Sequence, residues 1–141
     1  MSIKASIVGC GKMAEVHAAI INYLPHTELI ATCDSEVLMA RQLAERYGAK
    51  NYYDNVDRLL ADAKPDVVHI TTPPQSHYFI GKMCLESGSH IFVEKPFTVN
   101  YQETRELIDI AKNKKKKITV GTDEQFSIVA TKARDLIKDG W

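Results

Sequence analysis

The stretch IKASIVGCGKMAEVH, residues 3–17, places the pattern G-x-G-x-x-A between an apolar run and an amphipathic one. This pattern predicts a strand that turns through Gly9 and Gly11 into a helix that Ala14 lets pack closely on a sheet. The first glycine allows the sharp bend, and the second leaves room for phosphates beside the backbone. The free amides and positive dipole end of the helix favour an anion. The stretch therefore predicts a pyrophosphate site, although the pattern alone also fits an ordinary strand-to-helix turn.

An acidic residue, Asp34, ends the next apolar run, residues 28–33. A carboxylate at the tip of the second strand is where the ribose hydroxyls of adenosine are bound. Asp34 would repel the additional phosphate of NADP, and Ser35 and Glu36 offer no cation to bind it, so we expect NAD to be preferred over NADP. The alternative is that Asp34 is the N-cap of the helix that follows, and both roles are compatible.

Composition sets the outer limits on the kind of protein. The 141 residues are 45% hydrophobic and carry no formal net charge, which describes one globular domain with a real core. The chain has no apolar run of membrane-spanning length and no signal-peptide pattern, so we expect no membrane binding. Its three scattered cysteines lead us to expect a reducing cytoplasm. A lysine cluster, Lys112 and residues 114–117, falls at the end of a predicted helix. With zero net charge it predicts a solvated face and not a nucleic-acid site.

Cysteines and histidines show no metal-site pattern. The three cysteines contain no C-x-x-C pair and are odd in number, which argues against a disulfide framework and against zinc. Cys10 in the glycine turn is either a small filler or a thiol whose pKa is lowered at a helix N-terminus. The histidines at positions 17, 26, 69 and 90 lack ligand spacing, so we expect structural or solvent-facing roles for them and no metal.

Strand-like and helix-like patterns alternate along the chain. Strands are predicted near 3–8, 28–33, 52–53, 67–71, 90–93 and 117–120, and helices near 12–24, 36–46, 56–62, 76–87, 100–113 and 128–138. This alternation predicts an α/β fold with a doubly wound parallel sheet, the Rossmann fold, of about six strands with helices on both faces.

Two further segments lie where predicted strands reach their carboxyl ends, the edge at which open α/β sheets bind ligands. They are TTPPQSH, residues 71–77, and EKP, residues 94–96. Together with the glycine turn, in this order and at these spacings, they resemble the Gfo/Idh/MocA family of NAD(P)-dependent oxidoreductases over the whole chain. The resemblance implies hydride transfer between a nicotinamide cofactor and a hydroxyl or carbonyl carbon of a sugar, inositol or nucleotide sugar, by a parent enzyme that is a homo-oligomer.

The resemblance also implies roles for individual residues. Those expected to bind the cofactor are Gly9, Gly11, Lys12, Met13, Asp34, Thr72, Pro73, His77, Glu94 and Lys95. Lys95 is the expected catalytic residue, which hydrogen-bonds the substrate oxygen whose charge changes as hydride moves; the alternative is a surface lysine paired with Glu94. The bond between Lys95 and Pro96 is expected to be cis. Pro74 stands where family members commonly have asparagine.

Domain organisation follows from the same resemblance. Residues 1–122 are expected to form the NAD-binding domain, and residues 123–141 the start of the connection to a substrate domain that this chain does not contain. In the family, that second domain supplies a histidine as the acid/base partner of the lysine, and no histidine follows His90 here. We therefore expect this chain to bind cofactor better than it turns over substrate.

Two other functions fit part of the pattern. A non-catalytic nucleotide-binding or redox-sensing module would use the glycine turn and Asp34 but would have no use for Lys95. A methyltransferase also binds its adenosyl cofactor at a glycine-rich turn with an acidic residue on the second strand, and would have no role for residues 94–96.

Overall fold

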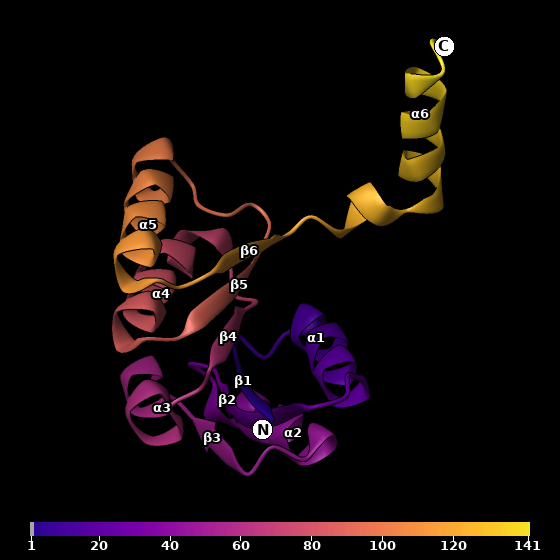
Figure 1. Ribbon diagram of the computed structural model, residues 1–141. Helices are drawn as coiled ribbons and strands as arrows, with labels where there is room; N and C mark the ends of the chain where they lie inside the picture. The colour runs from indigo at the N-terminus through magenta and orange to yellow at the C-terminus, as the bar shows by residue number, and fades with distance from the viewer. Residues whose placement is uncertain (1) are drawn as a thin grey trace.

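The computed structural model describes residues 2–141, and six parallel strands form its central sheet (Figure 1). The strands are β1 (Ile3–Val8), β2 (Thr27–Cys33), β3 (Asn51–Tyr53), β4 (Val67–Ile70), β5 (His90–Glu94) and β6 (Ile118–Gly121). Their order is β3-β2-β1-β4-β5-β6, and every neighbouring pair is parallel. This doubly wound order confirms the predicted fold class. It places the topological switch point between β1 and β4, where ligands of such sheets bind.

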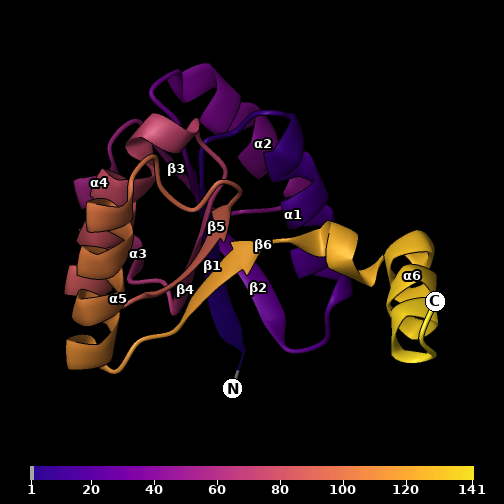
Figure 2. The ribbon, with the colours of Figure 1, turned by 90° about the horizontal axis from the view of Figure 1, so that it is seen from above.

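Helices cover both faces of the sheet. They are α1 (Lys12–Tyr23), α2 (Val37–Tyr47), α3 (Val56–Ala63), α4 (Pro74–Ser87), α5 (Tyr101–Lys114) and α6 (Ile128–Lys138), with a 3₁₀ helix, η1 (Asp123–Phe126). Figures 1 and 2 show α1 and α2 on one face and α3, α4 and α5 on the other. The predicted bounds hold within two residues. Helix α4 begins earlier than expected because Pro74 fits the first helical position, and η1 was not expected.

Each face of the sheet has its own apolar core. Residues of β1 and β2 pack against α1 and α2, with the side chains of Ile7, Ala14 and Ala18 fully buried. On the other face, β4 and β5 pack against α3, α4 and α5 around Ile70 and Leu107. The two cores fix the strand positions, and therefore the places at which the strands end.

The C-terminal arm, η1 and α6, differs from the rest of the molecule. It leaves β6 and projects away from the sheet and its covering helices (Figures 1 and 2). None of its residues is buried, and apolar side chains such as Phe126, Ile128 and Ile137 are exposed. Within residues 2–141, no helix is long and apolar enough to cross a bilayer.

Candidate cofactor and active site

The glycine turn connects β1 to α1 at the switch point. Gly9 has φ +92°, and its N–H donates to the carbonyl of Cys33 at 2.8 Å. A Cβ at Gly9 would lie 2.7 Å from both Cγ2 and the backbone nitrogen of Thr72, so the tight packing of β1 beside the β4 end excludes any side chain. Gly11, by contrast, would place a Cβ in open space. The turn is therefore closed toward β4 at Gly9 and open at Gly11, where a phosphate would approach.

Asp34 is bound to this turn by backbone hydrogen bonds. Its Oδ2 accepts from the N–H of Cys10 at 2.6 Å, and its Oδ1 accepts from the N–H of Glu36 at 2.9 Å. The N-cap of α2 is Glu36, so the alternative in which Asp34 is the N-cap is wrong: the helix begins two residues further along the chain. The carboxylate instead connects the end of β2 to the glycine turn.

A groove of about 740 Å³ lies outside the carboxyl ends of β1, β2 and β4. Three carboxylates, those of Asp34, Asp54 and Asp57, contribute to its wall, and no lysine or arginine does. Of the predicted site residues, Gly9, Gly11, Asp34, Thr72 and Pro73 line it. An anionic wall of this kind disfavours an additional phosphate at the ribose.

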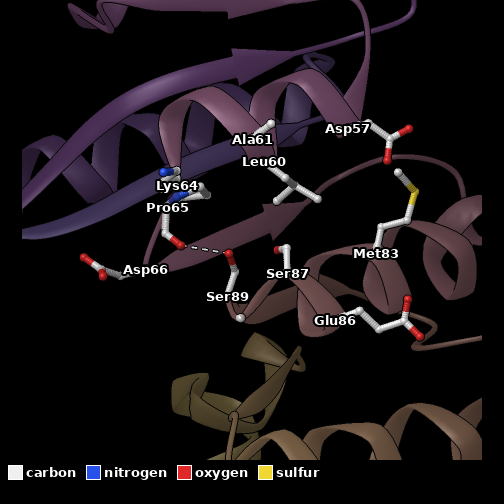
Figure 3. Close-up of a pocket in the computed structure, with 11 residues that line it drawn as sticks. Asp57, Leu60, Ala61, Lys64, Pro65, Asp66, Met83, Glu86, Ser87 and Ser89 are labelled. Carbon is white, nitrogen blue, oxygen red and sulfur yellow. Dashed lines mark hydrogen bonds between the residues drawn. The ribbon is translucent and has the colours of Figure 1, made fainter.

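A second hollow of about 620 Å³ lies between α3 and α4 (Figure 3). Its wall includes Pro65 and Asp66, which precede β4, and Ser89, which precedes β5. The Ser89 hydroxyl donates to the Pro65 carbonyl at 2.8 Å. This hollow therefore lies at the amino ends of the strands, the opposite edge from the glycine turn, and we assign no ligand to it.

Lys95 follows β5 directly, and the bond between Lys95 and Pro96 is cis, as expected. Its Nζ lies 3.2 Å from Oε1 of Glu124 in η1, and its backbone N–H donates to Oε2 of Glu94 at 3.3 Å. The hydrogen bond and charge of Glu124 raise the pKa of the Lys95 ammonium. The side chain is half exposed (52%). In the alternative interpretation, a surface lysine paired with Glu94, the partner is wrong, because the ammonium pairs with Glu124.

His77 is fully buried in the first turns of α4 and does not line the groove. Its Nδ1 lies 2.9 Å from the Pro96 carbonyl oxygen and its Nε2 lies 2.8 Å from the Thr72 carbonyl oxygen. The ring therefore bridges the loop after β4 and the loop after β5. His77 therefore supports the groove by holding these two loops together, and its side chain does not reach the groove. The preceding residue, Ser76, does line the groove, and its hydroxyl donates to Oγ1 of Thr72 at 2.7 Å.

Lys12 and Met13 occupy the first turn of α1 with exposed side chains, outside the groove wall. The helix has no side-chain cap, so its first amides are free to bind an anion. Cys10 is the filler of the turn: burial raises the pKa of its thiol to about 12, an effect to which Asp34 adds. The alternative in which the helix N-terminus lowers that pKa is wrong.

Sequence reasoning missed a cluster of His17, His69 and Glu94 beneath the β5 end. His17 Nδ1 lies 2.8 Å from His69 Nδ1, and His17 Nε2 lies 2.9 Å from Glu94 Oε1. The spacing of Ala14, His17, Ala18 and Ile21 indicates one buried helical face and could have shown that His17 points to the sheet. Its partners lie 52 and 77 positions away, and no local pattern indicates them. Across residues 2–141, no such cluster has metal-binding geometry.

Comparison with known proteins places this geometry in a family. The sequence pattern of the Gfo/Idh/MocA group, described as an oxidoreductase family with an NAD-binding Rossmann fold, matches residues 3–122. D-glucoside 3-dehydrogenase of Escherichia coli K12 is 32% identical over 139 residues, which are 98% of this chain and 40% of that protein. Inositol 2-dehydrogenase of Rhizobium meliloti is 27% identical over 140 residues, 99% of this chain and 42% of that protein.

Solved structures of NAD-bound oxidoreductases have the same fold as this chain. GenD2 from gentamicin A biosynthesis, in complex with NAD, has a TM-score of 0.92 at 26% identity and covers 98% of this chain and 39% of its own. WlbA dehydrogenase from Chromobacterium violaceum, in complex with NADH and UDP-GlcNAcA, has a TM-score of 0.91 at 26% identity and covers 98% of this chain and 40% of its own. The chain thus spans about 40% of the length of these relatives. It belongs to the Gfo/Idh/MocA oxidoreductase family, and residues 3–122 are its NAD-binding Rossmann fold.

Proposed function

We propose that the chain is the NAD(H)-binding portion of an oxidoreductase that transfers hydride between the nicotinamide and a hydroxyl or carbonyl carbon of a sugar, inositol or nucleotide sugar. The observation that carries this proposal is the groove at the β1–β4 switch point, with the glycine turn and Asp34 in one wall. The residues of the groove fit a dinucleotide, because Gly11 leaves open space for a phosphate at a helix N-terminus. D-glucoside and inositol dehydrogenases among the relatives support the substrate class.

Each part of the groove has a task in this proposal. The amides at the start of α1, with Gly9 and Gly11, bind the pyrophosphate, and Lys12 and Met13 cover the turn from outside. Asp34 binds the adenosine ribose hydroxyls through lone pairs that its two backbone hydrogen bonds leave free. Thr72 and Pro73 form the wall at β4, and His77 holds that wall to the loop after β5.

The nicotinamide supplies hydride chemistry when it is bound, and Lys95 supplies the charge at the reacting oxygen. Lys95 follows the strand next to β4, in the second half of the sheet, where the second nucleotide of a dinucleotide lies. Its ammonium would leave Glu124, an exposed partner, and donate to the substrate oxygen. Glu94 and Lys95 would contact the cofactor at this end.

The arm after residue 122 has a proposed task as well. We propose that residues 123–141 connect the NAD-binding unit to a substrate-binding part, since their exposed apolar side chains need a packing partner. Homo-oligomerisation of the parent enzyme and a cytoplasmic location belong to the same proposal. Three buried cysteines, all free, support a reducing compartment.

A titration with NADH and, separately, with NADPH tests the proposal. We expect saturable NADH binding, weaker NADPH binding, and loss of that preference in Asp34→Ala. A folded chain that binds neither cofactor would contradict the assignment of the groove. The competing non-catalytic module predicts that Lys95→Ala in the active enzyme leaves the rate unchanged, whereas hydride transfer through Lys95 predicts a large loss. The methyltransferase alternative lacks support, because the family match is to oxidoreductases.

A further inference from the structure

The cluster of His17, His69 and Glu94 lies directly beside Lys95, the proposed catalytic residue. Glu94 is the last residue of β5 and the neighbour of Lys95, and its side chain is only 15% exposed. A carboxylate with so little exposure to water needs hydrogen-bond donors from the protein. It has two: Nε2 of His17 at 2.9 Å from Oε1, and the N–H of Lys95 at 3.3 Å from Oε2.

The direction of the hydrogen bonds follows from what each group can do. A carboxylate only accepts, so Nε2 of His17 carries the proton of this contact. Nδ1 of His17 and Nδ1 of His69 lie 2.8 Å apart, so one ring donates to the other. Burial, with the neighbouring His17, lowers the pKa of His69 to about 4, so His69 is neutral at pH 7. Hydrogen bonds therefore link His69, His17 and Glu94 in one chain.

Packing fixes the rings in this arrangement. His69 stacks on Phe92 with centroids 5.1 Å apart, and His17 meets both rings edge-on at the same centroid distance. On the other side, a Cβ at Gly121 would lie 2.8 Å from Oε1 of Glu94, so β6 leaves only enough room for the carboxylate. The Glu94 side chain is thus bound by His17 of α1 and enclosed by β6, and His69 of β4 supports it through His17.

We propose that His17 is a positioning residue for Lys95: its Nε2–H holds the Glu94 carboxylate, which binds the Lys95 amide and so fixes the strand end that presents Lys95. His69 holds the other nitrogen, Nδ1, of the same ring. The relevance of this arrangement to hydride transfer rests on the proposed function, but the positioning itself is a property of the chain and is testable without substrate.

Three variants separate positioning from general stability. His17→Met keeps an apolar volume and removes both hydrogen bonds. His17→Gln keeps an amide N–H for Glu94 and a carbonyl oxygen for His69, so it should preserve the position of the Glu94 carboxylate. His26→Asn is the matched control: His26 is an exposed histidine with φ 62°, a conformation that asparagine tolerates.

The first measurement is amide hydrogen exchange of Lys95 by NMR, corrected for global stability. We expect exchange at Lys95 to be about tenfold faster in His17→Met, as expected for losing a charge-assisted hydrogen bond, and close to wild type in His17→Gln and His26→Asn. If His17→Met fails to fold, Glu94→Gln, which removes the charge and keeps the volume, should give the same local change. Unchanged Lys95 exchange, or equal change in the Met and Gln variants, would overturn the proposal.

The second measurement compares NADH with ADP-ribose, which lacks the nicotinamide. Because His69 and Glu94, the partners of His17, lie on β4 and β5, His17→Met should weaken NADH binding about threefold or more and leave ADP-ribose binding unchanged. Equal weakening of both ligands would indicate a general structural defect and would overturn positioning. If the wild-type chain binds neither ligand, the proposed function fails, and the exchange comparison still decides the role of His17.

Discussion

The two halves of the sheet present their functional groups in different ways. In the half made of β1, β2 and β3, the groups are mostly backbone: the glycine turn, and amides held by the Asp34 carboxylate. In the half made of β4, β5 and β6, they are side chains from separate elements, such as His17 from α1, His69 from β4 and Glu94 from β5. The first half depends on a short motif, and the second depends on tertiary packing.

The largest effect is expected where the two halves touch. Gly9→Ala would place a Cβ 2.7 Å from the Thr72 backbone at a φ of +92°, and we expect a loss of about 3 kcal/mol or more in the free energy of unfolding and loss of NADH binding. Gly11→Ala is the control, because its Cβ meets nothing. It should unfold like wild type in denaturant while binding NADH more weakly. A well-folded Gly9→Ala chain would show that the turn is not constrained by β4.

Acid should act mainly on the second half. The pKa of His69 falls from 6.5 to about 4 because the buried ring is desolvated, so the unfolded chain binds more protons between those values. The resulting stability is fully present above about pH 6.5 and is lost as pH falls toward 4, by about 3 kcal/mol in total. Unfolding free energies at pH 7.5 and 4.5 should therefore differ less in His69→Gln than in wild type. Parallel pH profiles of the two chains would count against a buried neutral His69.

A smaller loss of stability is expected from the first half. Asp34→Ala removes the acceptor of two backbone amides, those of Cys10 and Glu36, which should cost about 1–3 kcal/mol of unfolding free energy. Ser35→Ala serves as the control, since its hydroxyl makes only a 3.4 Å contact with Asp34. Denaturant melts of the two variants provide the measurement. Equal stability of both would mean that Asp34 serves the ligand and not the turn.

The smallest effect on folding is expected at the proposed catalytic residue. Lys95 pairs with Glu124 on the surface, where ion pairs contribute little, so Lys95→Ala should leave the melting temperature unchanged. For His17→Met we expect the opposite, a lower melting temperature, because His17 is buried among its neighbours. A clear drop in the melting temperature of Lys95→Ala would show instead that this exposed lysine stabilises the β4–β5–β6 half of the sheet.

Sequence reasoning came close to the observed fold because the alternation of patterns is local and each element obeys short-range rules. Helix ends at Asn55 and Asn100 use side-chain caps, and Gly48 and Gly88 end helices in left-handed conformations. The errors of the sequence-based prediction have local causes. The alternative that Asp34 is the N-cap of α2 failed because its carboxylate binds the Cys10 amide and the helix begins after Glu36, and η1 has no periodic signal in four residues.

By itself, the sequence determined the strand and helix pattern, the glycine turn and the carboxylate at the β2 end, because these are set by neighbouring residues and by backbone geometry. Only the tertiary structure decided that His17 and His69 meet Glu94, that His77 bridges two loops, and that Lys95 pairs with Glu124. Contacts between side chains far apart in the chain depend on where packing places the strand ends. The order β3-β2-β1-β4-β5-β6 brings those ends together.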